Sequence, residues 1–212
     1  MAKAGRLIYH GLLVAWDGFL IVWLSDVLWL LFCLPIITIP LAFAGLYTCT
    51  HGLAYGESLE WRSFFSGMKR NLGASLRWTG FNVFVIFVLV FYIWFFSTSG
   101  KSLFPSGLEF LIYIPVVLTF FWGIINLYTF PFMLAQQKPS YIQALRNSLV
   151  LFLKWPGIAL GFTLFNLIVI TLSVLLRFPW LVLGASLPAL LACMCVKYVI
   201  AQTLQTGTLA EI

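Results

Sequence analysis

The sequence predicts an all-α protein, a polytopic bundle of transmembrane helices. The chain has 212 residues, of which 62% are hydrophobic and only 8% are charged, whereas soluble domains average about 45–50% apolar and about 25% charged residues. Its uncharged runs, such as residues 27–56 and 110–137, reach or exceed the roughly 20 residues that cross a bilayer as a helix. We therefore expect a single transmembrane domain over residues 1–212, with the lipid bilayer as its first partner.

The first apolar segment, residues 7–56, must fold back on itself. As one helix it would be roughly 75 Å long, more than twice the hydrocarbon thickness of a membrane. Each proline in this segment removes a backbone donor and disfavours helix before it, so we place a turn at Pro35, Thr38 and Pro40. This turn gives six spans, at residues 12–34, 40–55, 76–96, 108–134, 155–176 and 179–203. The alternative is five spans, with the two prolines as a kink inside one long helix.

The basic residues favour six spans with both termini in the cytoplasm. Lys and Arg are enriched in short cytoplasmic loops. Six spans place every Lys and Arg except Lys101 and Arg177 on the cytoplasmic side, whereas five spans would move Lys3 and Arg6 outside. The prediction is a multi-pass protein of the bacterial cytoplasmic membrane. The net charge of +6 is explained by this orientation, and we expect no nucleic-acid partner.

Two cytoplasmic segments are predicted to form short interfacial amphipathic helices. In the first, apolar residues recur at helical spacing opposite Arg62, Lys69 and Arg70, and in the second the same pattern is weaker. Such helices lie among lipid headgroups, or they dock a cytoplasmic partner as the coupling helices of ABC permeases do. Both interpretations stay open. The candidate contact residues are Trp61, Phe64, Phe65, Lys69, Arg70, Tyr141 and Arg146.

An internal repeat is indicated by two similar entries into membrane helices. Arg77-Trp78-Thr79-Gly80 and Lys154-Trp155-Pro156-Gly157 are separated by about 77 positions. We expect two related units, roughly 40–98 and 108–177, each with a descending helix, a cytoplasmic segment and an ascending helix. Units of this kind would form a parallel repeat.

Four polar residues at membrane depth are candidates for a substrate-binding site. A charge in the bilayer costs about 2.5–3.5 kcal/mol on insertion scales, so Asp26 requires a partner or a role. Polar stripes on three later spans contain Asn82, Asn126 and Asn166. Helix–helix hydrogen bonds are one explanation for all four, and a polar cavity that they line together is the other.

The sequence contains no pattern typical of an active site. It has no phosphate-binding loop, no HExxH, no dinucleotide fingerprint and no Cys or His pair at metal-ligand spacing. We therefore expect no catalytic residue, no metal and no cofactor.

One stretch of the sequence resembles a known family. Residues 28–42, Leu-Trp-Leu-Leu-Phe-Cys-Leu-Pro-Ile-Ile-Thr-Ile-Pro-Leu-Ala, followed by Trp61-Arg62-Ser63-Phe64-Phe65 and Lys69-Arg70-Asn71, are similar to the YesL-like family of small bacterial membrane proteins. The resemblance covers roughly the first 80 residues, and the rest agrees mainly in length and span pattern. The chain departs from the family at Ile39, where Gly is usual, and at Asp26, where Asn is frequent.

The family has no established activity, but its members accompany carbohydrate-utilisation systems. The resemblance implies a non-enzymatic accessory component of carbohydrate uptake that associates with the membrane subunits of an ABC-type sugar importer. The alternative, based on the polar stripes, is a self-contained small-molecule transporter or channel. A homo-oligomer is compatible with either function.

Overall fold

The computed structural model describes residues 2–58, 60–98, 113–176 and 184–205, and these residues form helices and no strand. This confirms the all-α class. The predicted starts of two spans, at residues 108 and 179, lie outside the described residues, as do Lys101 and Arg177 and both ends of the unit 108–177. In chain order the helices are α1 (Ala2–Asp17), α2 (Phe19–Cys33), the 3-10 turn η1 (Ile36–Thr38), α3 (Ile39–Tyr55), α4 (Arg62–Arg70), α5 (Leu72–Thr98), α7 (Tyr113–Leu134), α8 (Tyr141–Lys154), α9 (Pro156–Leu176) and α11 (Ser186–Gln205).

Five helical segments are long and apolar enough to cross a membrane, a composition compatible with a multi-pass membrane protein. They overlap the second to sixth predicted spans. The segments are Ile36–Tyr55, Leu72–Phe96, Tyr113–Leu134, Pro156–Leu175 and Ser186–Leu204.

The first predicted span is not the single helix expected over residues 12–34. It consists of α1 and α2, which meet at Gly18 with a bend of 83°. Glycine disfavours helix interiors by about 1 kcal/mol, and a Cβ on Gly18 would lie only 2.7 Å from Cδ1 of Leu53 on α3. The bend therefore allows α1 to pack against α9 and α11 while α2 packs against α3. Together the bent pair still has the length and hydropathy of one broken span.

The chain turns back between α2 and α3. The ring centroids of Trp29 and Phe43 are 5.5 Å apart, although in a continuous helix these positions would be separated by roughly 21 Å. The Thr38 hydroxyl donates to the carbonyls of Phe32, at 2.5 Å, and Pro35, at 2.8 Å. Pro40 lies in the first turn of α3, where its missing N–H has no helical partner to lose. This segment is therefore a closed turn and not a kink within one helix.

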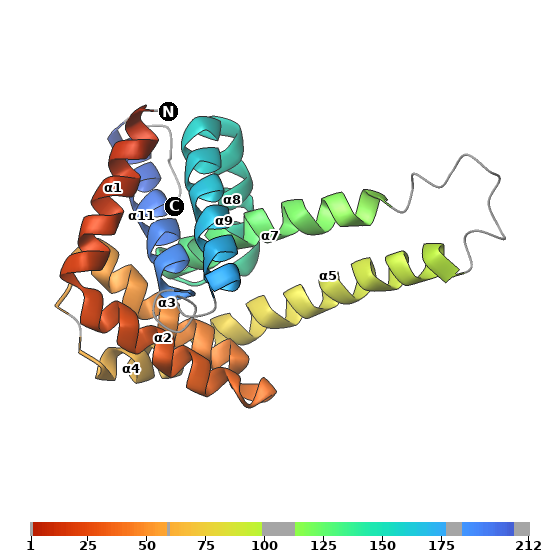
Figure 1. The fold of residues 1–212 in the computed structure, drawn as a ribbon, viewed down its shortest axis with the longest axis horizontal. Helices are drawn as coiled ribbons and strands as arrows, with labels where there is room; N and C mark the ends of the chain where they lie inside the picture. Colours follow the sequence, from red (N-terminus) through yellow and green to blue (C-terminus); the bar gives the residue numbers. More distant parts are fainter. Residues whose placement is uncertain (1, 59, 99–112, 177–183, 206–212) are drawn as a thin grey trace.

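The helices follow two main directions (Figure 1). Helices α5 and α7 run side by side and project from the rest of the molecule; we call this pair the helical arm. In the same view α1, α8, α9 and α11 run across the direction of the arm. Helix α11 is the centre of the body. In its most apolar stretch 67% of the residues are buried, whereas no residue is buried in the corresponding stretch of α5. The helices therefore do not share one bundle axis.

Candidate functional site

Asp26 is completely buried where α2 meets the start of α11. Its Oδ1 accepts the backbone N–H groups of Ala185, at 3.2 Å, and Ser186, at 2.8 Å, and its Oδ2 accepts the Ser186 hydroxyl at 2.7 Å. The first N–H groups of a helix lack partners within the helix, and the helix dipole favours a negative charge there. Asp26 thus caps α11 from a different helix, and this contact explains the buried charge.

The three asparagines have separate environments. Asn82 accepts the indole N–H of Trp122 at 2.9 Å, which joins α5 to α7. Asn126 donates to the Trp122 carbonyl at 3.0 Å. Asn166 on α9 is 1% exposed, and neither of its amide atoms has a hydrogen-bond partner in the described structure. No hydrogen bond among the described residues joins Asp26 to any of these asparagines.

Successive residues of a helix are rotated by about 100° around its axis, and the side chains of α4 fall on three faces. Phe64, Gly67 and Met68 are buried against α3, and a Cβ on Gly45 would lie 2.8 Å from the Phe64 ring. The side chain of Phe64 is therefore not available to lipid or to a partner, contrary to expectation. The second face contains Ser63, Ser66 and Arg70 and borders a cleft. We call the third face, formed by Trp61, Arg62 and Lys69, the outer face of α4, and all three residues are exposed.

The other predicted contact residues also include both packed and exposed side chains. The ring of Phe65 packs edge-on against Phe32 at 5.8 Å. On α8, Tyr141 is 9% exposed and its ring lies 5.0 Å from that of Phe81, so it packs inside the molecule. Arg146 is exposed. The amphipathic patterns therefore identified helices correctly but assigned to the outside several rings that pack against neighbouring helices.

A polar cleft of about 510 Å³ lies beside α3 and α4 where α7 ends and α5 begins. Sequence reasoning missed this cleft, because its residues come from two distant segments, 48–71 and 134–139, and form no motif. The only local signal was the occurrence of polar residues at the ends of apolar runs. The cleft is lined by Thr48, His51, Glu57, Ser63, Ser66, Arg70, Asn71, Leu134, Gln136, Gln137 and Pro139.

Close packing of α4 on α3 forms one side of the cleft. A Cβ on Gly67 would lie 2.5 Å from Cβ of Thr48, so the two helices approach as only a glycine allows. The Asn71 amide donates to the Thr48 hydroxyl at 3.0 Å, and that hydroxyl donates to the Ala44 carbonyl at 2.7 Å. These contacts fix the junction of α4 and α5 against α3.

Two nitrogens at the cleft have no partner in the described structure. Gln136 is 8% exposed; its Oε1 accepts the N–H of Ser140 at 2.8 Å, but its Nε2 is buried and unpaired. His51 stacks on Tyr55 at 4.4 Å, and its Nε2 is likewise unpaired. A buried polar group without a partner costs about 1–3 kcal/mol.

A lysine closes the end of α3 next to His51. The Lys197 ammonium donates to the Ala54 carbonyl at 2.8 Å and lies 5.1 Å from the Tyr55 ring centroid. Cations are favourable near helix C-termini. The stacked rings of His51 and Tyr55 are thereby held against α11.

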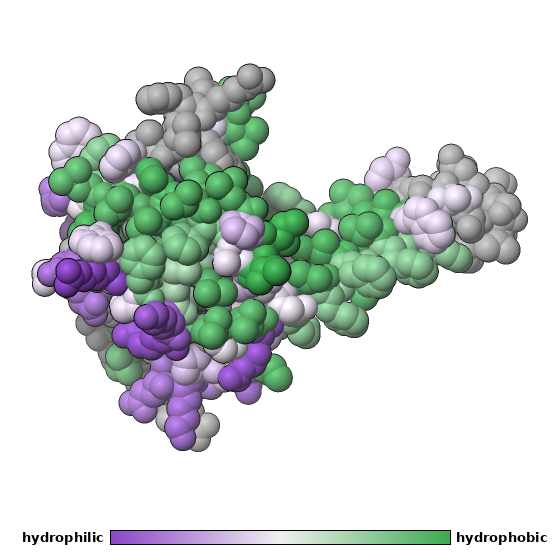
Figure 2. Space-filling model, turned by 90° about the horizontal axis from the view of Figure 1, so that it is seen from below, coloured by the Kyte–Doolittle hydropathy of each residue, from purple (hydrophilic) through white to green (hydrophobic). Residues whose placement is uncertain are grey.

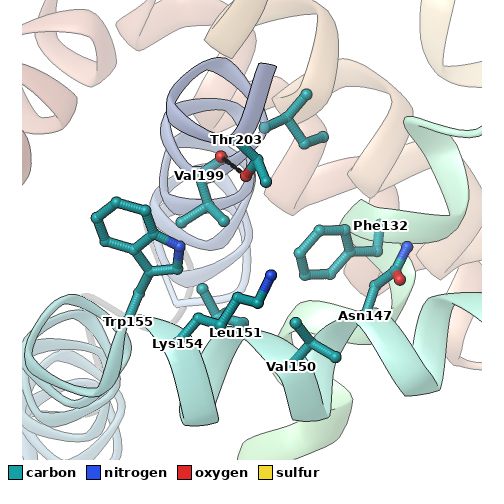
Figure 3. Close-up of a pocket in the computed structure, with 9 residues that line it drawn as sticks. Phe132, Asn147, Val150, Leu151, Lys154, Trp155, Val199 and Thr203 are labelled. Carbon is teal, nitrogen blue, oxygen red and sulfur yellow. Dashed lines mark hydrogen bonds between the residues drawn. The ribbon is translucent and has the colours of Figure 1, made fainter. Parts of the chain in front are cut away.

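A second cavity, between α7, α8 and α11, is only about 30 Å³ (Figure 3). Lys154 points into it between Phe132 and Trp155, and the Thr203 hydroxyl donates to the Val199 carbonyl at its edge. This volume is of the order of one water molecule. We therefore interpret this cavity as a packing gap.

The surface separates into two parts, with hydrophilic residues gathered on the body and a mainly hydrophobic helical arm (Figure 2). Fold and surface together define the class, an all-helical chain with several apolar helices compatible with a multi-pass membrane protein. Comparisons with protein-family models, curated proteins and solved structures found no match. Among the described residues, no three His, Cys, Asp or Glu side chains are placed to hold a metal ion.

Proposed function

We propose that this chain is a non-enzymatic membrane protein that acts by binding a second membrane protein through the outer face of α4. The supporting observation is that α4 packs on α3 with its apolar side and leaves Trp61, Arg62 and Lys69 exposed. The Arg62 guanidinium lies 5.5 Å from the Trp61 ring centroid. Trp and Arg are enriched among the residues that dominate binding energy at interfaces. A basic outer face suits an acidic loop on the partner.

The resemblance to the YesL-like family suggests the identity of the partner. We propose the membrane subunits of an ABC-type sugar importer, which makes the chain an accessory component of carbohydrate uptake in the bacterial cytoplasmic membrane. This step rests on the family resemblance, whereas the binding surface rests on the packing of α4.

Co-purification in mild detergent tests the association. The wild-type chain should retain the importer subunits in stoichiometric amounts, and the double variant Arg62→Glu, Lys69→Glu should lose them. Arg77→Glu is the control, because Arg77 is exposed and belongs to α5, not to the outer face of α4. Equal retention by the wild-type chain and the double variant would contradict the proposed surface.

The second candidate function is a self-contained transporter, and the polar cleft favours it. Sugar uptake into liposomes by the purified chain alone would establish this function and exclude a purely accessory role. The cleft lacks one common feature of sugar sites: its described lining contains no Phe, Tyr or Trp ring on which a sugar could stack.

We also propose six crossings, with α1 and α2 as one broken span and both termini cytoplasmic. Clustered basic residues on α4 and α8 support this topology through the positive-inside rule. The alternative is a five-crossing arrangement with α1 and α2 re-entrant, which the 83° bend between these two helices allows.

Cysteine labelling from outside intact cells separates the two topologies. In a chain whose four native cysteines are replaced by Ala, Ile37→Cys introduces a thiol at a position 87% exposed, and Gly5→Cys introduces one at an exposed position near the N-terminus. Six crossings predict labelling at residue 37 and protection at residue 5, because α1 and α2 then cross the membrane between them. Labelling at both positions would instead support five crossings.

A further inference from the structure

The polar cleft is lined by one cationic and one anionic side chain. Arg70 and Glu57 both line it, and neither forms an ion pair within the part of the chain that the structure describes. We propose that the cleft binds a phosphoethanolamine group, with the phosphate at Arg70 and the ammonium at Glu57.

The pair of opposite charges selects a zwitterion. An anion would be attracted by the Arg70 guanidinium but repelled by the Glu57 carboxylate. A cation would be attracted by Glu57 but repelled by Arg70. A guanidinium pairs with phosphate through two parallel hydrogen bonds. A volume of about 510 Å³ lies within the range of small-ligand sites, about 300–1,000 Å³.

The position of the cleft favours phosphatidylethanolamine as the source of this group. Arg70 is the last residue of α4, and α5 begins two positions later at Leu72. The most apolar stretch of α5 contains no buried residue. Leu72 and Leu76 at the start of α5 are 40% and 49% exposed. A lipid with its headgroup in the cleft therefore has an apolar helix along which its acyl chains can lie. This inference is independent of the proposed importer partner.

Lipid retention by the purified full-length chain tests the proposal. Protein from nanodiscs that contain phosphatidylethanolamine and phosphatidylglycerol with the same acyl chains is released into detergent, and native mass spectrometry measures the lipid still bound. The wild-type chain should retain phosphatidylethanolamine in preference to phosphatidylglycerol. Arg70→Gln should lower that retention about tenfold, the effect of losing a charge-assisted hydrogen bond.

The variants separate the two halves of the headgroup. Glu57→Gln should weaken phosphatidylethanolamine binding and leave phosphatidylglycerol unchanged, so the preference disappears. Arg77→Gln, which removes an exposed charge outside the cleft, should retain both lipids as the wild-type chain does. Thermal unfolding in the same detergent checks that each variant is folded.

Free phosphoethanolamine distinguishes a soluble ligand from a lipid. If it raises the unfolding temperature of the wild-type chain but not of Arg70→Gln, and the wild-type chain shows no preference for phosphatidylethanolamine, the shared chemistry is supported and the source is soluble. Equal retention of the two lipids by the wild-type chain, with no effect of free phosphoethanolamine, would overturn the proposal without any variant. Unchanged phosphatidylethanolamine retention by Arg70→Gln would overturn it as well.

Discussion

The carboxylate of Asp26 accepts both the backbone N–H and the hydroxyl of Ser186, at 2.8 and 2.7 Å. These bonds join the middle of α2 to the beginning of α11, the most buried of the apolar helices. Asp26, which the sequence suggested as a candidate substrate ligand, therefore makes a structural contact between two helices.

Removing the charge of Asp26 should destabilise the protein. In Asp26→Asn the amide oxygen can still accept the two N–H groups, but an NH2 group replaces the acceptor of the Ser186 hydroxyl and the negative charge at the start of α11 is lost. We therefore expect the free energy of unfolding to fall by about 1–3 kcal/mol. Denaturant unfolding in detergent, followed by circular dichroism, measures this change. Asp17→Asn is the control, because Asp17 is exposed and should tolerate the change. Equal stability of the two variants would show that the cap of α11 contributes little.

Filling the space at Gly45 should separate α4 from α3. The new Cβ of Gly45→Ala would lie 2.8 Å from the Phe64 ring, and overpacking of this kind costs about 1–3 kcal/mol. Gly123→Ala, with no neighbour within 4 Å, should leave stability unchanged or slightly higher. Adding Phe64→Leu to Gly45→Ala should restore part of the loss. No recovery in this double variant would argue against the contact.

The hydrogen bond between Asn82 and Trp122 should couple the two helices of the arm. A double-mutant cycle of Asn82→Leu and Trp122→Phe should give a coupling energy of about 0.6 kcal/mol, typical of polar contacts between membrane helices. A control cycle combines Asn82→Leu with Trp29→Phe in place of Trp122→Phe. The indole N–H of Trp29 is buried without a partner, so its coupling to Asn82 should be zero.

Lys197 should stabilise the C-terminal end of α3. Lys197→Met removes a hydrogen bond to the Ala54 carbonyl and a cation–π contact with Tyr55, so we expect a loss of about 1–2 kcal/mol in unfolding experiments. Lys197→Arg should preserve most of this stability. The exposed Lys138 provides the control variant Lys138→Met, and an equal effect at both positions would contradict the assigned role.

Several features of the fold were predictable because they depend on local properties of the chain. Hydropathy and run length predicted the apolar helices, and the proline pair with Thr38 predicted the turn between α2 and α3. The spacing of Trp61, Phe64 and Met68 predicted helix α4. Each of these features follows from the preferences of neighbouring residues for helix, turn or an apolar solvent, which the order of residues records directly.

The partners of the polar and aromatic groups were decided by tertiary structure. A glycine within an apolar run is compatible with a straight helix, and only the close approach of Leu53 explains the bend at Gly18. A charge within an apolar run indicates that Asp26 needs hydrogen-bond donors, but only the fold brings the start of α11 to its carboxylate. The cleft likewise exists because Thr48, Arg70 and Gln136 converge from separate segments. Such distances depend on how whole helices pack, a property that no single stretch of sequence contains.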